Sequence, residues 1–495
     1  MAESLKHKTV KGVSWSLIDD VSRLGVQFIV GVVLANLLTP AEFGIIGMVV
    51  IFTSIADSIV NSGFSSALIQ KKNAENIDYC TVFHFNMVLS VVLYIVLYFA
   101  SPAISHFFDE PQLISVTRVL GIVLFINALA IVQRTILVKK VDFKTQTIIS
   151  LISSVVSGVV GIGMALKDFG VWSLVGQTIT RQGLNTALLW AFNRWFPSWQ
   201  FSVNSFKTLF SFGSKLLVAG LIDTIWRDIY YVVIGKYYTK DTLGQYTRAR
   251  QYEGLFSSNL TSVIQRVTFP VLSSIQDQPA RLKEGYRRII KITMLVTFSC
   301  MLGLAAVAKP AILILIGEKW IPCITYMQIL CFAGMLYPLH AINLNMLNVK
   351  GRSDLFLKLE IIKKIIAIGP IVLGIMYSIE WMLWGSVIVS IISYFLNAQY
   401  SGPLIGYSIP NQLRDILPGF LMAGTMAAIT WPISWIDFGI GARLSLYVML
   451  GVQILVGVVL MLGMCEYFKT SEYLELKQLA FSALNKVRHR VKAAH

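Results

Sequence analysis

The segment Thr39-Pro40-Ala41-Glu42-Phe43-Gly44 ends one long apolar stretch and opens the next, and it recurs as Thr239-Lys240-Asp241-Thr242-Leu243-Gly244. Both copies have the pattern Thr-x-x-x-[Phe/Leu]-Gly at the same place in the hydropathy profile. Six apolar segments separate the copies, and because six is an even number the two halves have the same orientation in a bilayer. The repeat therefore predicts two parallel six-helix lobes.

Composition places this repeat in a membrane. The chain has 495 residues, of which 55% are hydrophobic and only 14% are charged. A soluble protein of this length would have about 25% charged residues. The net charge of +16 comes from basic residues between the apolar runs, where the anionic cytoplasmic leaflet and the insertion machinery explain them. We therefore predict a polytopic membrane protein with no nucleic-acid partner.

Working outward from the repeat, we find apolar stretches long enough to cross the hydrocarbon core as helices. They predict an all-α protein of about fourteen transmembrane helices, with two helices added after the two lobes. The tenth stretch contains Pro322 and Pro338, which predict a break. The predicted spans are 13–38, 42–64, 79–101, 115–138, 145–166, 170–192, 209–235, 243–272, 288–308, 322–347, 355–377, 380–400, 413–435 and 441–464.

The connecting loops orient the spans. Basic clusters, such as Lys139, Lys140 and Lys144 or the run in 281–291, fall on alternate sides, and the opposite loops contain few cations. By the positive-inside rule we expect both termini to be cytoplasmic. The N-terminus has no cleavage site and predicts a retained first helix. Because every loop is short, we expect no catalytic domain and no enzyme activity.

These boundaries define the predicted domains. The N-terminal lobe is 1–192, a cytoplasmic linker is 193–208, and the C-terminal lobe is 209–402. Helices 13 and 14 occupy 403–464, and 465–495 is a basic amphipathic cytoplasmic tail suited to an anionic membrane surface. A tail without helical order is the alternative.

The five cysteines have no paired motif, which argues against disulfides and structural metal. Cys80 and His84 share a helix face, and packing is the expected role of that pair. We predict no metal and no cofactor.

Ionisable residues inside spans are costly and mark function by default. Asp19 and Arg23, and likewise Asp223 and Arg227, are spaced to pair within a helix, and such pairs could serve packing alone. Arg118, Arg134, Arg248 and Arg266 lie nearer the predicted interfaces, where they could snorkel. Arg23, Arg181 and Lys215 are too deep for that. The candidate cavity cations are Arg23, Arg181, Lys215, Arg227, Arg248 and Arg250, and the candidate charge-balancing or coupling acids are Asp19, Asp20, Asp57, Asp223 and Asp228.

Cations fixed in a low-dielectric cleft favour an anion, and the planar guanidinium suits phosphate. The buried acids could balance this charge or bind protons. A cationic drug would instead require unpaired acids and aromatic groups.

Five blocks of sequence resemble a known family. They are 243–250, 267–276, Lys140-Val141-Asp142-Phe143-Lys144, Gly170-Val171-Trp172-Ser173-Leu174-Val175 and Ile316-Gly317-Glu318-Lys319-Trp320. In their order along the chain these blocks are similar to Wzx-type polysaccharide flippases of the multidrug/oligosaccharidyl-lipid/polysaccharide exporter superfamily, particularly the colanic-acid and teichuronic-acid exporters. Ser22-Arg23-Leu24-Gly25 also resembles a run in lipid II flippases, although Val26-Gln27 replaces the Arg-Asp that follows there.

The resemblance implies a two-lobed transporter that alternates access to a cationic cavity. It implies translocation of undecaprenyl-pyrophosphate-linked oligosaccharide repeat units across a bacterial inner membrane for capsule, exopolysaccharide or O-antigen synthesis, with a polymerase and a chain-length regulator as expected partners. A multidrug or small-molecule cation antiporter of the same fold is the main alternative. An integral-membrane glycan polymerase or ligase is a third, and it would require a longer external loop.

Overall fold

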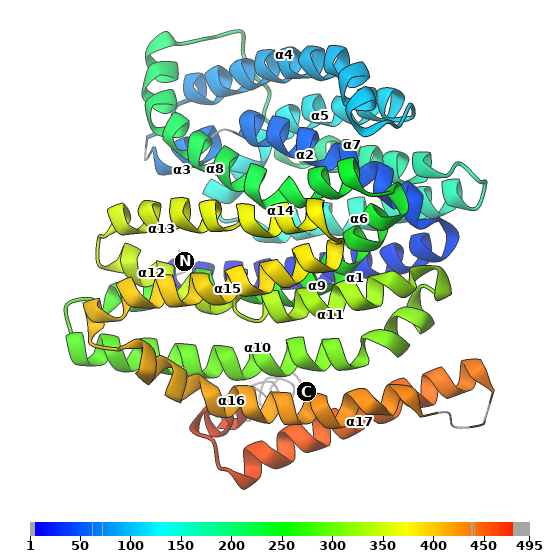
Figure 1. Cartoon of the computed structure of the whole chain (residues 1–495). Coiled ribbons are helices and arrows are strands. Elements are labelled where there is room, and N and C mark those ends of the chain that lie inside the picture. The colour runs from blue at the N-terminus through cyan, green and yellow to red at the C-terminus, as the bar shows by residue number, and fades with distance from the viewer. Residues whose placement is uncertain (1–4, 62, 72, 437–438, 440, 479–495) are drawn as a thin grey trace, which may run out of the picture. The chain divides into compact units, whose positions relative to one another are not determined.

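The computed structural model describes residues 5–478 apart from 62, 72, 437–438 and 440, and some helical side chains within that range are also outside the description. Every element of the described residues is a helix (Figure 1). The chain divides into two compact units, and the boundary between them follows Thr247. The predicted lobe boundaries at 192 and 209 stay a prediction.

In the first unit, α4 packs on α5, α6 on α7, and α1 on α6. α8 packs against α2, so this helix belongs to the first unit by its contacts. The helices are α1 (Leu5–Leu37), α2 (Pro40–Asn61), α3 (Phe64–Gln70), α4 (Asn76–Phe108), α5 (Leu113–Lys139), α6 (Phe143–Ala165), α7 (Val171–Asn193), α8 (Val203–Tyr237) and the start of α9 (Lys240–Ser274).

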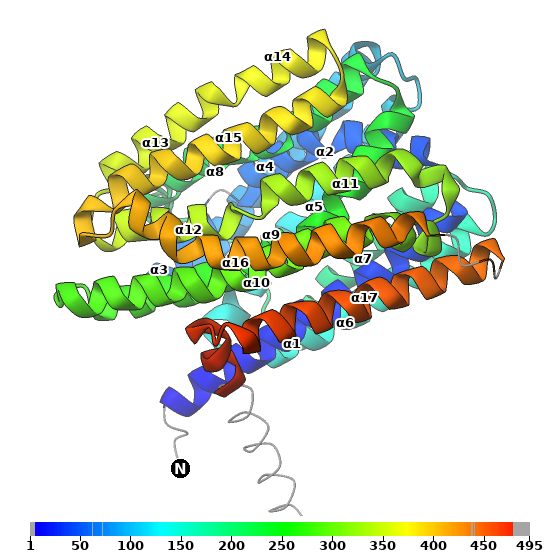
Figure 2. The same ribbon diagram turned by 60° about the horizontal axis from the view of Figure 1, so that its bottom comes forward.

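In the second unit, α10, α16 and α17 run side by side (Figure 2), and α15 packs against both α11 and α14. The helices after α9 are α10 (Pro279–Leu315), α11 (Ile321–Gly334), α12 (Tyr337–Val349), α13 (Ser353–Ile366), α14 (Ile368–Met376), α15 (Ile379–Ser401), α16 (Ile409–Thr430) and α17 (Ala442–Tyr467), with short 3₁₀ turns at Glu318–Trp320, Pro403–Ile405 and Trp431–Trp435.

Each predicted span coincides with a helix or a helix pair. Within the described residues, ten helices are long and apolar enough to cross a bilayer, or eleven if the bent halves of α8 form one span. The segments that fall short are α7, α9 and the α13–α14 pair. The count of fourteen requires all three to cross as well, and it stays a prediction. The break predicted in the tenth span is present, because α12 begins one residue before Pro338.

Polar residues fix where several helices begin. Glu75 and Asp78 form a reciprocal capping box at the start of α4. The Asp142 carboxylate accepts the Thr145 backbone N–H at 3.1 Å and caps α6. Ser202 does the same for α8. These local interactions satisfy backbone donors that have no partner inside the helix.

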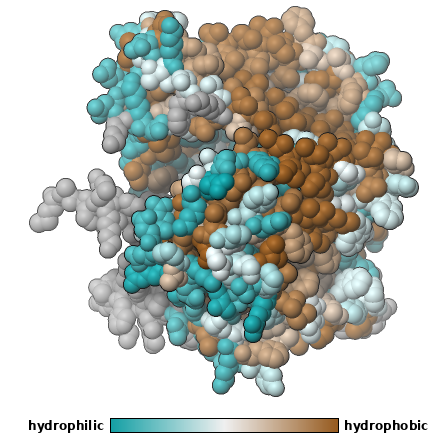
Figure 3. Space-filling view, turned by 60° about the vertical axis from the view of Figure 1, so that its left-hand side comes forward, coloured by the Kyte–Doolittle hydropathy of each residue, from teal (hydrophilic) through white to brown (hydrophobic). Residues whose placement is uncertain are grey.

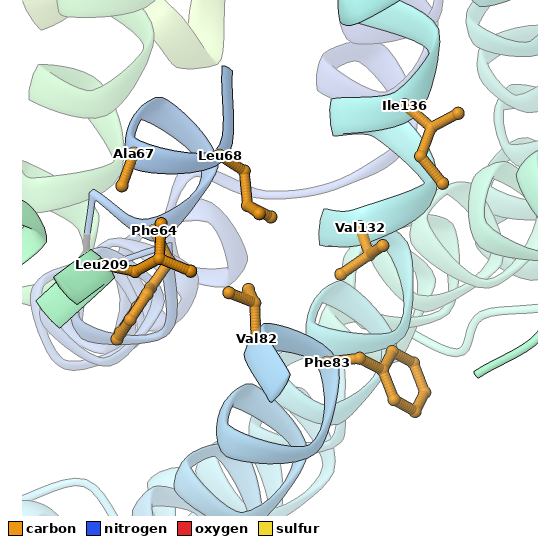
Figure 4. Close-up of a cluster of buried hydrophobic side chains, with 8 residues drawn as sticks. All are labelled: Phe64, Ala67, Leu68, Val82, Phe83, Val132, Ile136 and Leu209. Carbon is orange, nitrogen blue, oxygen red and sulfur yellow. The ribbon is translucent and has the colours of Figure 1, made fainter. Parts of the chain in front are cut away.

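One apolar core in the first unit joins segments far apart in the sequence. The short helix α3, which the sequence analysis does not predict, inserts between α4, α5 and α8 (Figure 4). This packing holds the first half of α8 in the first unit. The buried residues are Phe64, Ala67, Leu68, Val82, Phe83, Val132, Ile136 and Leu209.

The two copies of the repeat meet in this unit. A Cβ atom on Gly44 would lie 1.9 Å from the carbonyl oxygen of Lys240, and one on Gly244 would lie 1.8 Å from the carbonyl oxygen of Pro40. No side chain can occupy either position, so only glycine lets the two helix starts cross this closely. Gly44 corresponds to Gly244 in the repeat, and Pro40 corresponds to Lys240, so the two contacts are equivalent to each other. The sequence repeat is therefore also a local structural symmetry.

The molecular surface is strongly apolar. Figure 3 shows hydrophobic residues over broad areas of one face, bordered by hydrophilic patches. Phe99 is 75% exposed and Val159 is 67% exposed, both on helices that are apolar enough to span a membrane. Contact with lipid explains such a surface, whereas water would penalise it.

Candidate functional site

A polar cavity of about 370 Å³ lies within the first unit, between α1, α5, α6 and α7. Arg23 comes from α1, Arg134 from α5, and Arg181 from α7. Amide and hydroxyl groups complete the polar wall, and Ile149 and Leu189 supply apolar surface. The further polar residues at the cavity are Asp19, Gln27, Gln146, Ser150, Ser153, Ser154, Gln182 and Asn185.

Positive charge dominates this cavity, with three arginines against the single carboxylate of Asp19. Asp19 and Arg23 have the spacing of a helical pair, but Arg23 Nη2 instead lies 3.4 Å from Asp20 Oδ1. Arg181 lies close enough to Arg23 for electrostatic repulsion between the two guanidinium groups. Among the described residues neither Arg134 nor Arg181 forms an ion pair. Like charges held together in this way attract an anion.

Asp57 is half-buried and does not line the cavity. Asn127 Nδ2 donates to Asp57 Oδ1 at 2.8 Å, and Asn61 Nδ2 donates to Asp57 Oδ2 at 2.9 Å. Asp57 also interacts electrostatically with Arg134. Both oxygens of this carboxylate are therefore engaged within the first unit.

The structure corrects the interpretation of Arg134. From the sequence, the Arg134 side chain could snorkel toward a membrane interface. In the structure it lines the cavity instead. Its position on α5, two turns after Asn127, places both residues on the helix face that approaches Asp57. The i, i+7 spacing of Asn127 and Arg134 is the sequence signal that could have identified this face.

The α8 candidates lie elsewhere. Asp223 is exposed, and Arg227 Nε lies 3.3 Å from Asp228 Oδ1, so Arg227 pairs with its neighbour and not with Asp223. Asp228 is 6% exposed. None of these three lines the cavity of the first unit. The side chain of Lys215 lies outside the described residues.

The two arginines of α9 are in the second unit. Arg248 is 2% exposed, and its Nη1 donates to Gln251 Oε1 at 2.6 Å. Arg250 Nη1 donates to the Tyr337 hydroxyl at 3.4 Å. These contacts are with residues of the second unit, and neither arginine is among the residues that line the cavity of the first unit.

Cys80 and His84 both contact the segment that precedes α8. Cys80 Sγ lies 3.3 Å from the Ser198 hydroxyl, and His84 Nε2 lies 2.9 Å from the Ser198 carbonyl oxygen. The pair therefore holds the predicted linker against α4.

A family model described as "Polysaccharide biosynthesis protein" matches residues 33–325, which is more than half of the chain. The chain belongs to this family.

Relatives of this family member extend over most of its length. The chain is 25% identical to the teichuronic acid biosynthesis protein TuaB of Bacillus subtilis, covering 87% of this chain and 90% of TuaB. It is 24% identical to the lipopolysaccharide biosynthesis protein WzxC of Escherichia coli, covering 86% and 87%. It is 23% identical to the succinoglycan biosynthesis transport protein ExoT of Rhizobium meliloti, covering 80% and 81%. The predicted resemblance to polysaccharide flippases is confirmed.

Solved structures show the same fold. The inward closed conformation of the lipid II flippase MurJ aligns with a TM-score of 0.73 at 14% identity, covering 93% of this chain and 98% of MurJ. An inward-facing multidrug resistance MATE transporter of the MOP superfamily aligns with a TM-score of 0.61 at 15% identity, covering 78% and 98%. The predicted class, an all-α multi-pass membrane protein of this superfamily fold, is confirmed.

Proposed function

We propose that this family member moves undecaprenyl-pyrophosphate-linked oligosaccharide repeat units across the bacterial inner membrane by alternating access. The observation on which this rests is the cavity of the first unit, where Arg23, Arg134 and Arg181 converge. The relatives support this proposal, since TuaB is a teichuronic acid biosynthesis protein, WzxC a lipopolysaccharide biosynthesis protein and ExoT a succinoglycan biosynthesis transport protein.

The cavity suits the head group of such a lipid. A guanidinium binds phosphate oxygens through two parallel hydrogen bonds, and a charge-assisted bond contributes about 1.5–3 kcal/mol. Amide groups of Gln27, Gln182 and Asn185 can exchange hydrogen bonds with sugar hydroxyls. In a diphosphate joined to a sugar, the diphosphate would contact the arginines and the sugar would contact the amide side chains.

A cation antiporter of the same fold is the competing function, and the fold alone does not separate the two. The charge of the cavity does, because a cationic substrate would meet three arginines and one carboxylate. A polymerase or ligase would require a catalytic group exposed to the outer surface, whereas these polar residues lie among the helices of the first unit. We therefore place translocation, and not catalysis, at this site.

The proposal extends to topology and partners. Both termini are cytoplasmic, since the basic loops lie on that side. A polymerase and a chain-length regulator would receive the repeat units after they cross.

The test is a double variant, Arg23→Gln with Arg181→Gln, expressed in cells whose polysaccharide export depends on this chain. Export should fall strongly, and lipid-linked repeat units should accumulate in the cytoplasmic leaflet. Arg118→Gln is the matched control, because Arg118 is engaged by Ser101 and Tyr98 away from the cavity. A double variant that inserts normally and exports at the parental rate would refute the cationic-cavity proposal.

A further inference from the structure

The second unit contains a buried carboxyl group for which translocation as proposed above has no use. Glu253 lies on α9 within the predicted span 243–272 and is 1% exposed. Among the described residues, neither of its carboxyl oxygens has a hydrogen-bond partner. Burying a charged carboxylate in such surroundings costs free energy. An ionisable residue at such a position is therefore by default a candidate functional group.

A glycine makes the space for this carboxyl. Gly334 is the last residue of α11, and a Cβ atom there would lie 2.0 Å from Glu253 Oε1 and 3.0 Å from Glu253 Cδ. The carboxyl therefore rests against backbone at the break between α11 and α12. The end of a helix has a partial negative charge, which adds to the cost of an anion at this place.

The groups that face Glu253 offer little compensation. On its own helix, Arg250 Nη1 lies 3.9 Å from Glu253 Oε2 and also contacts Tyr337 of α12, and the Ser257 hydroxyl is near but makes no hydrogen bond. From α11 the titratable group is the buried Cys331 thiol. α10 presents the Met301 methyl group at Gly334.

This environment selects a proton over a metal cation. Hard metal cations bind through several oxygen ligands at once. Among the described residues no group of three His, Cys, Asp or Glu side chains could hold a metal ion, and the α10 and α11 side chains near Glu253 and Gly334 are a thioether and a thiol. A proton requires one oxygen and removes the charge.

Asp57 is the other acidic residue that we consider for proton binding. Two side-chain amides already bind its carboxylate, at 2.8 and 2.9 Å. Hydrogen bonds from these amides stabilise the carboxylate form of Asp57, which makes Asp57 the weaker candidate for a proton-binding group. Within the described part of the chain no group donates a hydrogen bond to the Glu253 carboxyl, and its charged partner Arg250 lies 3.9 Å away.

We infer that Glu253 is the proton-binding group that couples transport by this chain to a transmembrane proton gradient. The inference rests on the proposed transport function and adds to it a driving ion and a residue. Glu253 holds a proton while it is packed against Gly334, and it releases the proton when the helix break opens the pocket to water.

The first experiment measures proton binding without any substrate. The purified full-length protein in lipid nanodiscs is titrated with pH, and infrared difference spectra record the carbonyl stretch of protonated carboxylic acids. Glu253→Gln should remove one titrating band. Glu466→Gln is the control, because Glu466 is exposed and bound by Lys477, and it should leave that band unchanged. A spectrum identical to the parent in Glu253→Gln, or loss of the band in Asp57→Asn instead, would overturn the inference.

The second experiment measures coupling. Proteoliposomes with pH gradients of either sign are loaded with polyprenyl-diphosphate glycolipid extracted from the producing cells. One gradient should accelerate flipping by the parent, and in Glu253→Gln the ratio of rates with and without the gradient should fall to one. Parent flipping that is indifferent to the proton gradient, or that requires sodium ions, overturns the inference and leaves the proposed function intact. A parent that moves no glycolipid refutes the proposed function itself, and the infrared band then reports proton binding alone.

A third variant tests the geometry. Gly334→Ala places a methyl group where Glu253 Oε1 now lies, so it should displace the carboxyl and shift the pH at which the band titrates. An unchanged titration in folded Gly334→Ala protein would show that the Gly334 contact does not control proton binding.

Discussion

Two arginines of one helix show how surroundings decide the role of a charged residue. Arg118 Nε donates to the Ser101 hydroxyl at 2.9 Å, and its guanidinium lies 4.1 Å from the Tyr98 ring centroid. Arg134 lies on the same α5 but at the cavity, near Arg181 and Asp19. The first arginine is engaged by its own neighbours away from the cavity, and the second, although it also interacts with Asp57, lines the cavity where an anionic ligand would bind.

Arg134→Gln should therefore weaken substrate binding. Loss of one charge-assisted contact costs about 1.5–3 kcal/mol, which corresponds to roughly a ten- to hundredfold rise in the substrate concentration for half-maximal flipping. Proteoliposomes titrated with glycolipid measure it. Arg118→Gln should remain at the parental value, and an equal loss in both variants would mean that α5 tolerates neither change for structural reasons.

Arg181→Lys tests the shape of the contact. Lysine keeps the charge but replaces the planar fork by a point charge, so it should restore only part of the affinity lost in Arg181→Gln. The same flipping titration compares the three proteins. Full restoration by lysine would indicate that charge alone, without bidentate recognition, accounts for the role of Arg181.

At the scale of elements, the decisive feature is the crossing of the two helix starts at Gly44 and Gly244. Each glycine faces a backbone carbonyl of the other repeat copy, so neither neighbour can rotate away as a flexible side chain would. Gly47 adds to the same seam, since a Cβ atom there would lie 3.1 Å from the Thr247 hydroxyl. The crossing is thus fixed by main chain.

Gly44→Ala and Gly244→Ala should each destabilise the first unit, because forcing atoms into a tight contact typically costs about 1–3 kcal/mol. Thermal unfolding of the detergent-solubilised protein measures the effect. Gly163→Ala is the control: nothing lies within 4 Å of its added Cβ, and alanine is the better helix former. If Gly44→Ala unfolds at the same temperature as Gly163→Ala, the helix starts do not cross as closely as the structure shows.

At the scale of the whole molecule, topology depends on the segments that are least apolar. α7 contains Arg181 and Gln182 at the cavity, and α9 contains Arg248, Arg250 and Glu253. The polar groups that lower their hydropathy are the groups from which we argue function. The same polar residues therefore lower the hydropathy of these helices and supply the proposed functional groups.

A reporter fused after His495 should be active only in its cytoplasmic form, and one inserted between Tyr238 and Thr239 only in its external form. An even number of spans with basic cytoplasmic loops requires this pair of results. An external C-terminus would mean that one of α7, α9 and the α13–α14 pair does not cross, and it would contradict the parallel repeat.

The sequence by itself determined the class, the position of each predicted span and the repeat. Hydropathy and charge alternation act along the chain, because the bilayer sets the length of each span and the side of each basic loop. Pro338 marked the break before α12 for an equally local reason, the missing backbone donor. The short helix α3 was missed because it is too brief to show a period.

Only the tertiary structure decided which charged residues share a site. It joined Arg23, Arg134 and Arg181, set Asp223 and Arg227 apart, and placed Glu253 against Gly334. These outcomes depend on how each helix is rotated about its axis and on which neighbour it packs against. Packing of side chains distant in the sequence sets both, as the reciprocal contacts of Gly44 and Gly244 do for α2 and α9.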